Sequence, residues 1–354
     1  MTDLKSKSRR SIMVRSLAAA GAVAVPGMFA SKARAAEGFV LRDAGGLWGQ
    51  AAKKAFYEPF TKETGIEITV ATSGPDPLSQ VKTMVDSKTY LWDCLNITVP
   101  AADTLTAQGY LEEIDWSGST MSELIPQAHL KTLMGINVFA TVFAYRTDAM
   151  KKAPRTWADF FDVAGFPGRR GMRKSPIDSL EQALLADGVP ANKLYPLDVD
   201  RAFRKLDTIK KNVGLWWSGA AQSAQALSTG EVDICGMWNS RAQTSIEDKA
   251  PVKIVWEQAL YGVEGWAILK GSPKAPLVQK FVKFCADPKR QAEYVGIVPF
   301  GPTNPNAYKY IDASRAALLP TAPAHFPRMI YQDPSYWGPN QEKLTERFNA
   351  WVLS

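Results

Sequence analysis

The residues of this chain that could do chemistry are aromatic rings and carboxylates, because the familiar catalytic motifs are missing from its 354 residues. His129 and His325 are the two histidines, and neither lies in an HExxH or HxxxH spacing that would hold a metal. The sequence contains no GxSxG nucleophile motif, no Walker loop and no GxGxxG turn. We therefore predict a protein that is not an enzyme, with no catalytic residues, no cofactor and no metal. A hydrolase that works with paired carboxylates is the alternative.

Tryptophan is unusually frequent, with eleven residues in the chain. Trp238 follows the strand-like segment 232–237, so its ring is expected to face a cleft, and burial in the core is the alternative. Trp216 and Trp217 precede Ser218 at a predicted helix start, and we expect one of these two rings to face outward. An aromatic face beside acids attracts an ammonium group, with roughly 0.5–2 kcal/mol per ring.

Three acids could accompany those rings. Asp178 and Glu181 lie on the helix that opens at Pro176, and Glu264 lies beside a later apolar strand with a glycine on either side at positions 262 and 265. Asp178 also fits a capping box that begins at Ser175, so its carboxylate could serve the helix alone. The sequence leaves both interpretations of Asp178 open.

Strand-like and helix-like segments alternate through the chain, which is typical of an α/β protein. The first unit is predicted to be βαβ, with Gly45 and Gly46 at the strand-to-helix turn. These glycines either expose backbone N–H groups to a ligand or simply form a tight turn. We expect strands at 39–42, 66–70, 91–97, 110–114, 137–146, 232–237 and 265–269, and helices at 47–64, 77–87, 101–108, 176–187, 199–211, 221–229, 273–286 and 288–295.

Two apolar segments, 137–146 and 265–269, flank a complete α/β block. This order indicates that the chain leaves a first lobe, builds a second and returns to the first. We predict that lobe 1 comprises 36–143 and 265–310, that lobe 2 comprises 144–264, and that 311–354 is a C-terminal helical segment packed across the lobes. Ligands in such folds bind at the carboxyl ends of strands.

The first 35 residues have the features of an export signal. Arg9 and Arg10 precede an apolar run at 17–30, which ends near the small-residue triplet 33–35. A membrane anchor is the disfavoured alternative, because glycine and proline interrupt a run that is already shorter than the ~20 residues of a membrane span. We predict a twin-arginine signal peptide that is cleaved after about Ala35.

Cleavage there would leave 35 basic and 34 acidic residues. No clustered excess of Lys and Arg survives, so the composition argues against a nucleic-acid partner. Cys94, Cys235 and Cys285 form an odd set inside apolar segments, which predicts buried free thiols rather than a disulfide framework.

Several short segments resemble the bacterial periplasmic spermidine/putrescine-binding proteins, a family of solute-binding proteins of ABC transporters. The match begins with Gly230-Glu231-Val232-Asp233 and continues in Trp238-Asn239-Ser240-Arg241. Further similar segments, in the same order along nearly the whole mature chain, are Thr64-Gly65-Ile66, Val142-Phe143-Ala144-Tyr145-Arg146-Thr147-Asp148, Pro154-Arg155-Thr156-Trp157 and Val298-Pro299-Phe300-Gly301-Pro302-Thr303-Asn304-Pro305.

This resemblance implies a type II-like periplasmic binding fold, α/β with central sheets flanked by helices in two hinged lobes. It implies that Trp238 stacks on an aliphatic amine while Asp178, Glu181 and Glu264 receive its ammonium ends. One departure concerns Gly262, which stands where these receptors usually place an aromatic ring, so one wall of the aromatic box is missing. Arg241 and the amides around Ser218 could receive an anion, which makes 4-aminobutyrate a credible ligand beside putrescine. Arg241 could equally be a solvent-exposed charge on the helix surface.

The resulting prediction is a monomeric periplasmic receptor that delivers a small amine or amino acid to an ABC permease. A ferric-ion receptor of the same fold is the alternative within binding proteins, although the paired tyrosines typical of that class are missing, and a twin-arginine-exported hydrolase is the alternative from another class. The candidate ligand contacts are Gly45, Gly46, Ser73, Thr98, Asp178, Glu181, Trp217, Ser218, Trp238, Arg241, Tyr261 and Glu264.

Overall fold

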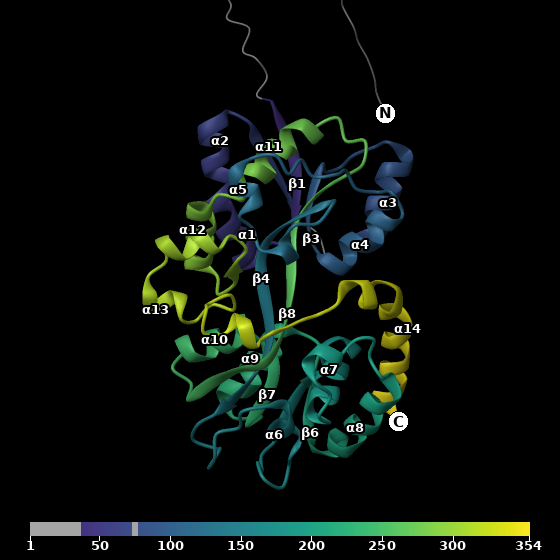
Figure 1. Ribbon diagram of the computed structural model, residues 1–354, viewed down its shortest axis with the longest axis vertical. Helices are drawn as coiled ribbons and strands as arrows, with labels where there is room; N and C mark the ends of the chain where they lie inside the picture. Colours follow the sequence, from purple (N-terminus) through teal and green to yellow (C-terminus); the bar gives the residue numbers. More distant parts are fainter. Residues whose placement is uncertain (1–36, 73–76) are drawn as a thin grey trace, which may run out of the picture. The chain divides into compact units, whose positions relative to one another are not determined.

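The computed structural model describes residues 37–72 and 77–354, which fold around one ten-stranded sheet of mixed direction (Figure 1). Eight strands follow the order β2-β1-β3-β8-β4-β7-β5-β6, while β9 pairs with β4 and β10 pairs with β8. The strands are β1 Gly38–Asp43, β2 Glu67–Thr72, β3 Cys94–Thr98, β4 Leu133–Arg146, β5 Arg170–Arg173, β6 Val213–Trp217, β7 Ile234–Trp238, β8 Val252–Ile268, β9 Gly301–Pro302 and β10 Ile330–Tyr331.

Helices cover both faces of this sheet (Figure 1). They are α1 Gly46–Ala52, α2 Glu58–Thr64, α3 Leu78–Ser87, α4 Val99–Ala107, α5 Ser119–Ser122, α6 Trp157–Phe161, α7 Pro176–Ala186, α8 Val199–Ile209, α9 Ala220–Thr229, α10 Asn239–Glu247, α11 Ala275–Cys285, α12 Pro288–Ile297, α13 Ala313–Ala316 and α14 Pro334–Leu353. None of these helices is long and apolar enough to cross a membrane.

The first unit is βαβ, as predicted, with β1 and β2 parallel. The helix expected at 47–64 is interrupted by a π-helical turn at Lys53–Tyr57, which joins α1 to α2. Phe56 and Phe60 are buried on this segment, and Gly65 ends it with a left-handed φ of 71°. Ala51 and Ala55 are buried on the same segment, whereas Leu47 at its start is 58% exposed.

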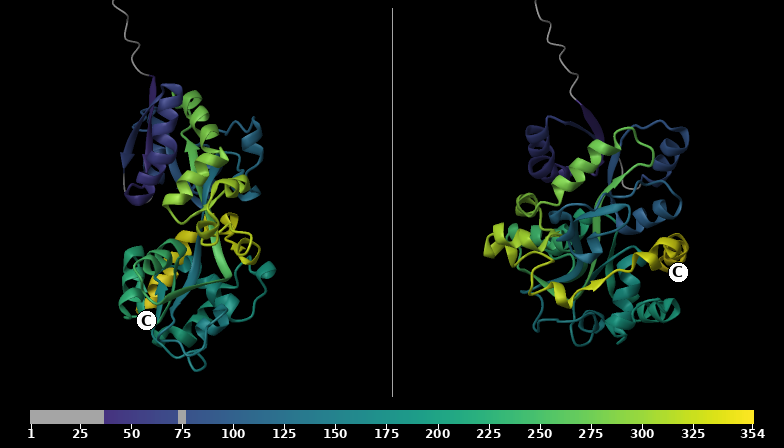
Figure 2. Two further views of the ribbon diagram at one scale, coloured as in Figure 1. Left: turned by 90° about the vertical axis from the view of Figure 1, so that its left-hand side faces the viewer. Right: turned by 45° about the horizontal axis from the view of Figure 1, so that its top comes forward.

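Strands β4 and β8 are the longest, with 14 and 17 residues. They pair antiparallel from Leu133 opposite Ala267 to Arg146 opposite Val252, and the register shifts twice along the way. In Figures 1 and 2 they run lengthwise through the middle of the unit and connect the group of helices around β1 to the group around β6. Both strands therefore take part in both ends of the sheet. The division of the chain into two hinged lobes stays a prediction.

The buried apolar residues form two clusters. The larger comprises residues between Phe39 and Met329, on strands and on the helices packed against them, and the smaller lies among β4, α6, α7, α8 and α14 around Phe143 and Trp157. Helix α14 contributes Phe348 to the smaller cluster and also contacts α4 and α7. The three cysteines are buried and free, as predicted.

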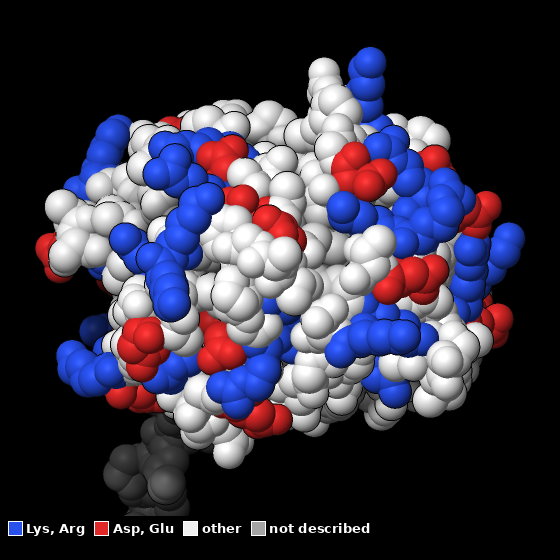
Figure 3. Space-filling model, turned by 90° about the horizontal axis from the view of Figure 1, so that it is seen from below, with Lys and Arg blue, Asp and Glu red and all other residues white. Residues whose placement is uncertain are grey.

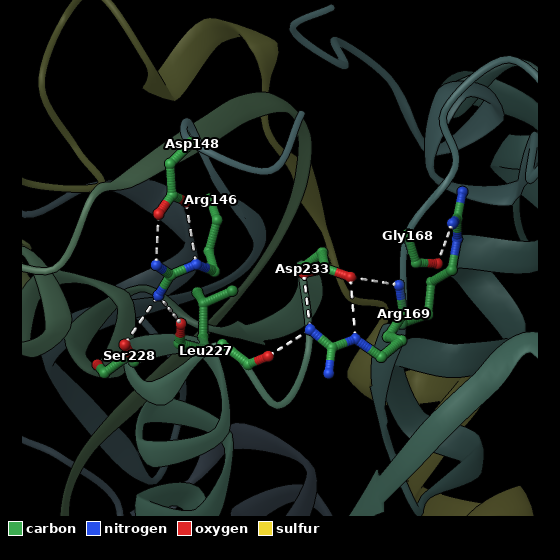
Figure 4. Close-up of polar contacts among 9 residues, drawn as sticks. Arg146, Asp148, Gly168, Arg169, Leu227, Ser228 and Asp233 are labelled. Carbon is green, nitrogen blue, oxygen red and sulfur yellow. Dashed lines mark hydrogen bonds and ion pairs between the residues drawn. The ribbon is translucent and has the colours of Figure 1, made fainter. Parts of the chain in front are cut away.

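Two arginines hold the turn that follows α9 (Figure 4). The Nη1 atom of Arg146 donates to the carbonyl oxygens of Leu227 at 3.1 Å and Ser228 at 2.8 Å, which lie in the last turn of α9. Arg169 pairs with Asp233 and donates to the carbonyl of Gly230. These carbonyls lack partners within the helix, and cations are favoured at this end of its dipole. The segment Gly230–Asp233 therefore has a structural role in ending α9.

Replacing Arg146 by glutamine is expected to lower the free energy of unfolding by about 1–2 kcal/mol, because two helix-end carbonyls lose a charged donor. Urea denaturation measures this change. The matched control is Lys131→Gln, which removes an ion pair with Glu113 whose two side chains are each 68% exposed. That variant should shift stability by less than about 0.5 kcal/mol. Equal effects of the two substitutions would contradict the capping role of Arg146.

Candidate ligand-binding site

A cavity of about 220 Å³ lies where three strands end. Thr98 ends β3, Arg173 ends β5 and Trp238 ends β7, and all three residues line the cavity. This position agrees with the general rule that ligands bind at the carboxyl ends of strands in α/β folds. The complete lining comprises Thr98, Val99, Pro100, Phe139, Arg173, Ile177, Asp178, Trp238, Gly262, Val263, Tyr331, Gln332, Trp337 and Gln341.

The cavity holds one guanidinium and one carboxylate in direct contact. Arg173 Nη1 lies 2.8 Å from Asp178 Oδ2, and Gln332 Nε2 donates to Asp178 Oδ1 at 3.0 Å. The guanidinium carbon of Arg173 also lies 5.1 Å from the centroid of the Trp238 ring, within cation–π range. Asp178 is 1% exposed, so its charge is compensated by these partners rather than by water.

Asp178 does not cap its helix, so that interpretation of the sequence is wrong. The Ser175 side chain makes no capping hydrogen bond, and Asp178 has a left-handed φ of 76° inside the first turn of α7. Such a backbone costs of order 1–3 kcal/mol for a residue other than glycine and is found mainly at binding and active sites. The carboxylate pairs with Arg173 instead.

Arg173 is not among the candidate ligand contacts predicted from the sequence, and the glycine- and arginine-containing segment 165–171 before it was not predicted to form a strand. In the structure this segment leads into strand β5, and Arg170 is fully buried there. Arg170 donates to the backbone carbonyls of Phe160, Asp162 and Phe166. One feature of the sequence indicates this position: Arg173 stands just before the helix start at Ser175-Pro176. A strand that ends at Arg173 therefore places its side chain beside Asp178.

Glu181 lies behind the cavity and does not line it. It is fully buried, and its Oε1 atom accepts hydrogen bonds from Tyr195 at 2.8 Å and from Trp337 Nε1 at 2.6 Å. Its Oε2 atom has no partner among the described residues. Burial, followed by the nearby charge of Asp178, raises the pKa of Glu181 to about 7. Glu181 thus supports Trp337, which does line the cavity.

Glu264 lies next to the cavity but outside its lining. Its Oε1 atom accepts hydrogen bonds from Trp48 Nε1 at 2.8 Å and from Asn137 Nδ2 at 2.9 Å. Desolvation raises the pKa of this carboxyl above its usual range. Trp48 and Asn137 were not among the predicted site residues.

Neither ring of the tryptophan pair faces the cavity, which corrects the prediction for Trp217. Trp217 is fully buried, donates to the carbonyl of Gly236 at 2.9 Å and packs edge-on against Trp238 with 5.8 Å between the ring centroids. Trp216 packs against Phe348 and Trp351 of the C-terminal helix. Trp217 therefore acts as a support for the Trp238 ring.

The other predicted contacts lie elsewhere. Ser218 and Arg241 are exposed and do not line the cavity. Gly45 and Gly46 line a separate hollow of about 440 Å³ beside Asp43 and Lys53. Tyr261 is buried against Phe326 and Tyr331, and Ser73 lies outside the described residues.

The wall that Gly262 was expected to leave open is closed from the neighbouring strand. Phe139 on β4 pairs directly with Gly262 on β8. A Cβ atom at position 262 would lie only 2.5 Å from Cζ of Phe139, so the ring occupies the space that a side chain at 262 would fill. The aromatic box is therefore not open at this point.

A mixed sheet flanked by helices, with strand ends that converge on a small polar and aromatic cavity, has the arrangement expected of a protein that binds a small solute. The model of the family described as bacterial extracellular solute-binding protein matches residues 55–321, and the chain belongs to this family. This confirms the resemblance to the solute-binding proteins of ABC transporters.

Relatives and solved structures agree with the family. The chain is 33% identical over 331 residues to the gamma-aminobutyric acid-binding protein of Pseudomonas aeruginosa, covering 92% of this chain and 94% of the relative. It is 26% identical over 266 residues to the spermidine/putrescine-binding periplasmic protein of Escherichia coli, covering 70% and 74%.

Two solved structures match most of the chain. An ABC transporter substrate-binding protein from Bradyrhizobium japonicum matches with a TM-score of 0.83 and 34% identity, covering 89% of this chain and 99% of that one. The Atu4243-GABA receptor matches with a TM-score of 0.83 and 32% identity, covering 89% and 98%. The predicted fold class, that of a periplasmic binding protein, is confirmed.

Proposed function

We propose that this protein is the periplasmic receptor of an ABC importer for 4-aminobutyrate or a similarly short amino acid with separated charges. The observation that carries the proposal is the pair formed by Arg173 and Asp178, with Trp238 beside it, in one cavity. A guanidinium is the preferred partner of a carboxylate, and a carboxylate is the natural acceptor for an ammonium group. A ligand that bears both charges complements both side chains.

A diamine complements the same cavity less well. Putrescine carries two ammonium groups and no anion, so one of its charges would lie near the Arg173 guanidinium without compensation. The names of the relatives support the same choice, since the relative at 33% identity is a gamma-aminobutyric acid-binding protein and the polyamine-binding one is at 26%. The anion site proposed here is Arg173, in place of Arg241.

Transport rather than turnover is part of the proposal. We infer that residues 1–35 direct export by the twin-arginine route, that the mature chain works in the periplasm as a monomer, and that it delivers its ligand to a permease without chemical change. Lys and Arg side chains are interspersed with Asp and Glu on the face seen in Figure 3, which does not favour a nucleic-acid partner.

Calorimetric titration of residues 36–354 tests the proposed ligand. We expect 4-aminobutyrate to bind more tightly than putrescine and spermidine, and Trp238→Ala to weaken 4-aminobutyrate binding by roughly tenfold, because the methylene chain loses its aromatic wall. The matched control is Trp256→Ala, since that ring stacks on His325 outside the cavity. Tighter binding of putrescine by the unaltered protein would overturn the choice of ligand.

A further inference from the structure

The two halves of helix α14 have different neighbours. The first half, residues 334–341, lies against α4, since a Cβ atom at Gly338 would be 3.8 Å from Oγ1 of Thr104. The second half, residues 344–353, lies against α8, where Phe348 packs on Phe203. In Figure 1 the helix accordingly runs from α4 above to α8 below. It therefore connects the group of helices around β1 to the group around β6.

The second half of α14 is held in place by polar contacts. Arg347 Nη2 lies 2.7 Å from Asp200 Oδ1, and Trp351 Nε1 donates to Asp207 Oδ1 at 2.7 Å. Lys210, directly after α8, donates to the carbonyl of Trp351. Because Asp200 and Asp207 belong to α8, this half is anchored on α8 by hydrogen bonds as well as by apolar packing.

The first half of α14 has no such anchor on α4. No hydrogen bond or ion pair joins these two helices within residues 37–72 and 77–354, and a hollow of about 690 Å³ opens between them. Burial, followed by the nearby charge of Asp333, raises the pKa of Asp103 on α4, so two carboxylates lie close together here. Pro339 lies inside α14 and has no N–H to donate to the carbonyl of Ser335, which weakens the helix between its halves. The contact between α4 and α14 is therefore the one that can open.

Both helices also contribute to the wall of the ligand cavity. Val99 and Pro100 come from the start of α4, while Trp337 and Gln341, one turn apart, come from the first half of α14. A ligand that contacts both walls favours the arrangement in which the two helices are close. Glu181 of α7 supports this arrangement from behind, because it accepts a hydrogen bond from Trp337 Nε1 at 2.6 Å.

We propose that the first half of α14 is a strap that closes on α4 when the cavity is filled, while the second half stays anchored on α8. This inference rests on the proposed function, because it takes 4-aminobutyrate to be the molecule that fills the cavity. Without ligand, the contact between Gly338 and Thr104 opens, and the helix bends near Pro339. With ligand bound, the strap covers the cavity and slows the release of the ligand.

Hydrogen exchange of the unaltered protein tests the strap without any substitution. With saturating 4-aminobutyrate, the amides of residues 337–341 should exchange roughly tenfold more slowly, because the strap is held against α4. The amides of residues 346–353, in the anchored half of the same helix, serve as the internal control and should keep their exchange rates.

The double variant Thr104→Cys/Gly338→Cys tests whether a closed strap retains the ligand. The two positions are within reach of a disulfide, and the three native thiols are buried. Saturating 4-aminobutyrate should speed the formation of this disulfide roughly fivefold or more. The oxidised variant should release 4-aminobutyrate roughly tenfold more slowly than the reduced one, because the strap cannot open. Thr104→Cys and Gly338→Cys alone are the matched controls, and oxidant should leave the release from each unchanged.

The outcomes separate this inference from the proposed function. Failure of the unaltered protein to bind 4-aminobutyrate overturns the proposed function. If 4-aminobutyrate binds, equal slowing of exchange in both halves of α14 overturns the strap, as does a disulfide that forms at the same rate with and without ligand. Unchanged release from the oxidised double variant overturns the role of the strap in retaining the ligand. Circular dichroism of each variant shows that the fold is intact.

Discussion

Replacing Arg173 by glutamine is expected to weaken the binding of 4-aminobutyrate about 100-fold or more, whereas putrescine binding should be unchanged or stronger. The guanidinium is the one cation among the residues that line the cavity in the described chain, so the carboxylate of the ligand loses its charged partner. The same change frees the buried Asp178 carboxylate to accept an ammonium group. Opposite effects on the two ligands are therefore the signature of this site.

Calorimetry with both ligands measures the change, and Arg241→Gln is the matched control because Arg241 is an exposed arginine outside the cavity. Arg241→Gln should leave both affinities within about twofold of the unaltered protein, a difference of a few tenths of a kcal/mol. The opposite result would identify Arg241 as the residue that binds the carboxylate: a large loss of 4-aminobutyrate binding in Arg241→Gln, with little change in Arg173→Gln.

Replacing Glu181 by glutamine is expected to stabilise the fold at alkaline pH, by up to about 3 kcal/mol near pH 8. The pKa of Glu181 is raised from an ordinary 4.5 to about 7, chiefly by burial. The folded state therefore keeps a proton that the unfolded state releases, and the contribution to stability present below pH 4.5 is lost as the pH rises through 7. Glutamine keeps an acceptor for Tyr195 and Trp337 and has no charge to bury.

Urea denaturation between pH 5 and 8 measures this effect. The difference between Glu181→Gln and the unaltered protein should grow with pH across that window. The matched control is Glu346→Gln, at an exposed position of α14, which should change stability by less than about 0.5 kcal/mol. Retained binding of 4-aminobutyrate by Glu181→Gln would agree with a supporting role for Glu181. Lost binding in a stabilised variant would show that Glu181 contacts the ligand after all.

Strands and helices could be predicted where apolar residues recur within the element itself. The strand predicted at 265–269 covers only the last four residues of β8, and Val252–Glu264 was missed. Lys253 and Glu257 are exposed in the first part of that stretch and interrupt the apolar pattern. The strand expected at 110–114 is wrong, since only Leu111 forms a bridge there, to Leu269. Apolar content alone does not decide whether a segment finds a partner strand.

The site was predictable only in part, because several of its contacts join residues that are far apart in the sequence. Trp238, Asp178 and Thr98 stand at the ends of recognisable elements, and all three line the cavity. Gln332 reaches Asp178 across 154 positions of sequence, and Trp337 reaches Glu181 across 156, so no local spacing could reveal them. The ring of Phe139 likewise became visible as a wall only once its register opposite Gly262 was known.

The scattered origin of the cavity wall has a consequence for exchanging ligand preference between relatives. Its lining residues come from the ends of β3, β5 and β7, the starts of α4 and α7, the middles of β4 and β8, strand β10 with Gln332 after it, and helix α14, so no contiguous block of the gene encodes it. Chimeras that swap whole segments would break the pairing of β4 with β8 before they transferred a preference. Ligand preference is therefore better exchanged by point substitutions at these separate positions than by exchange of one segment.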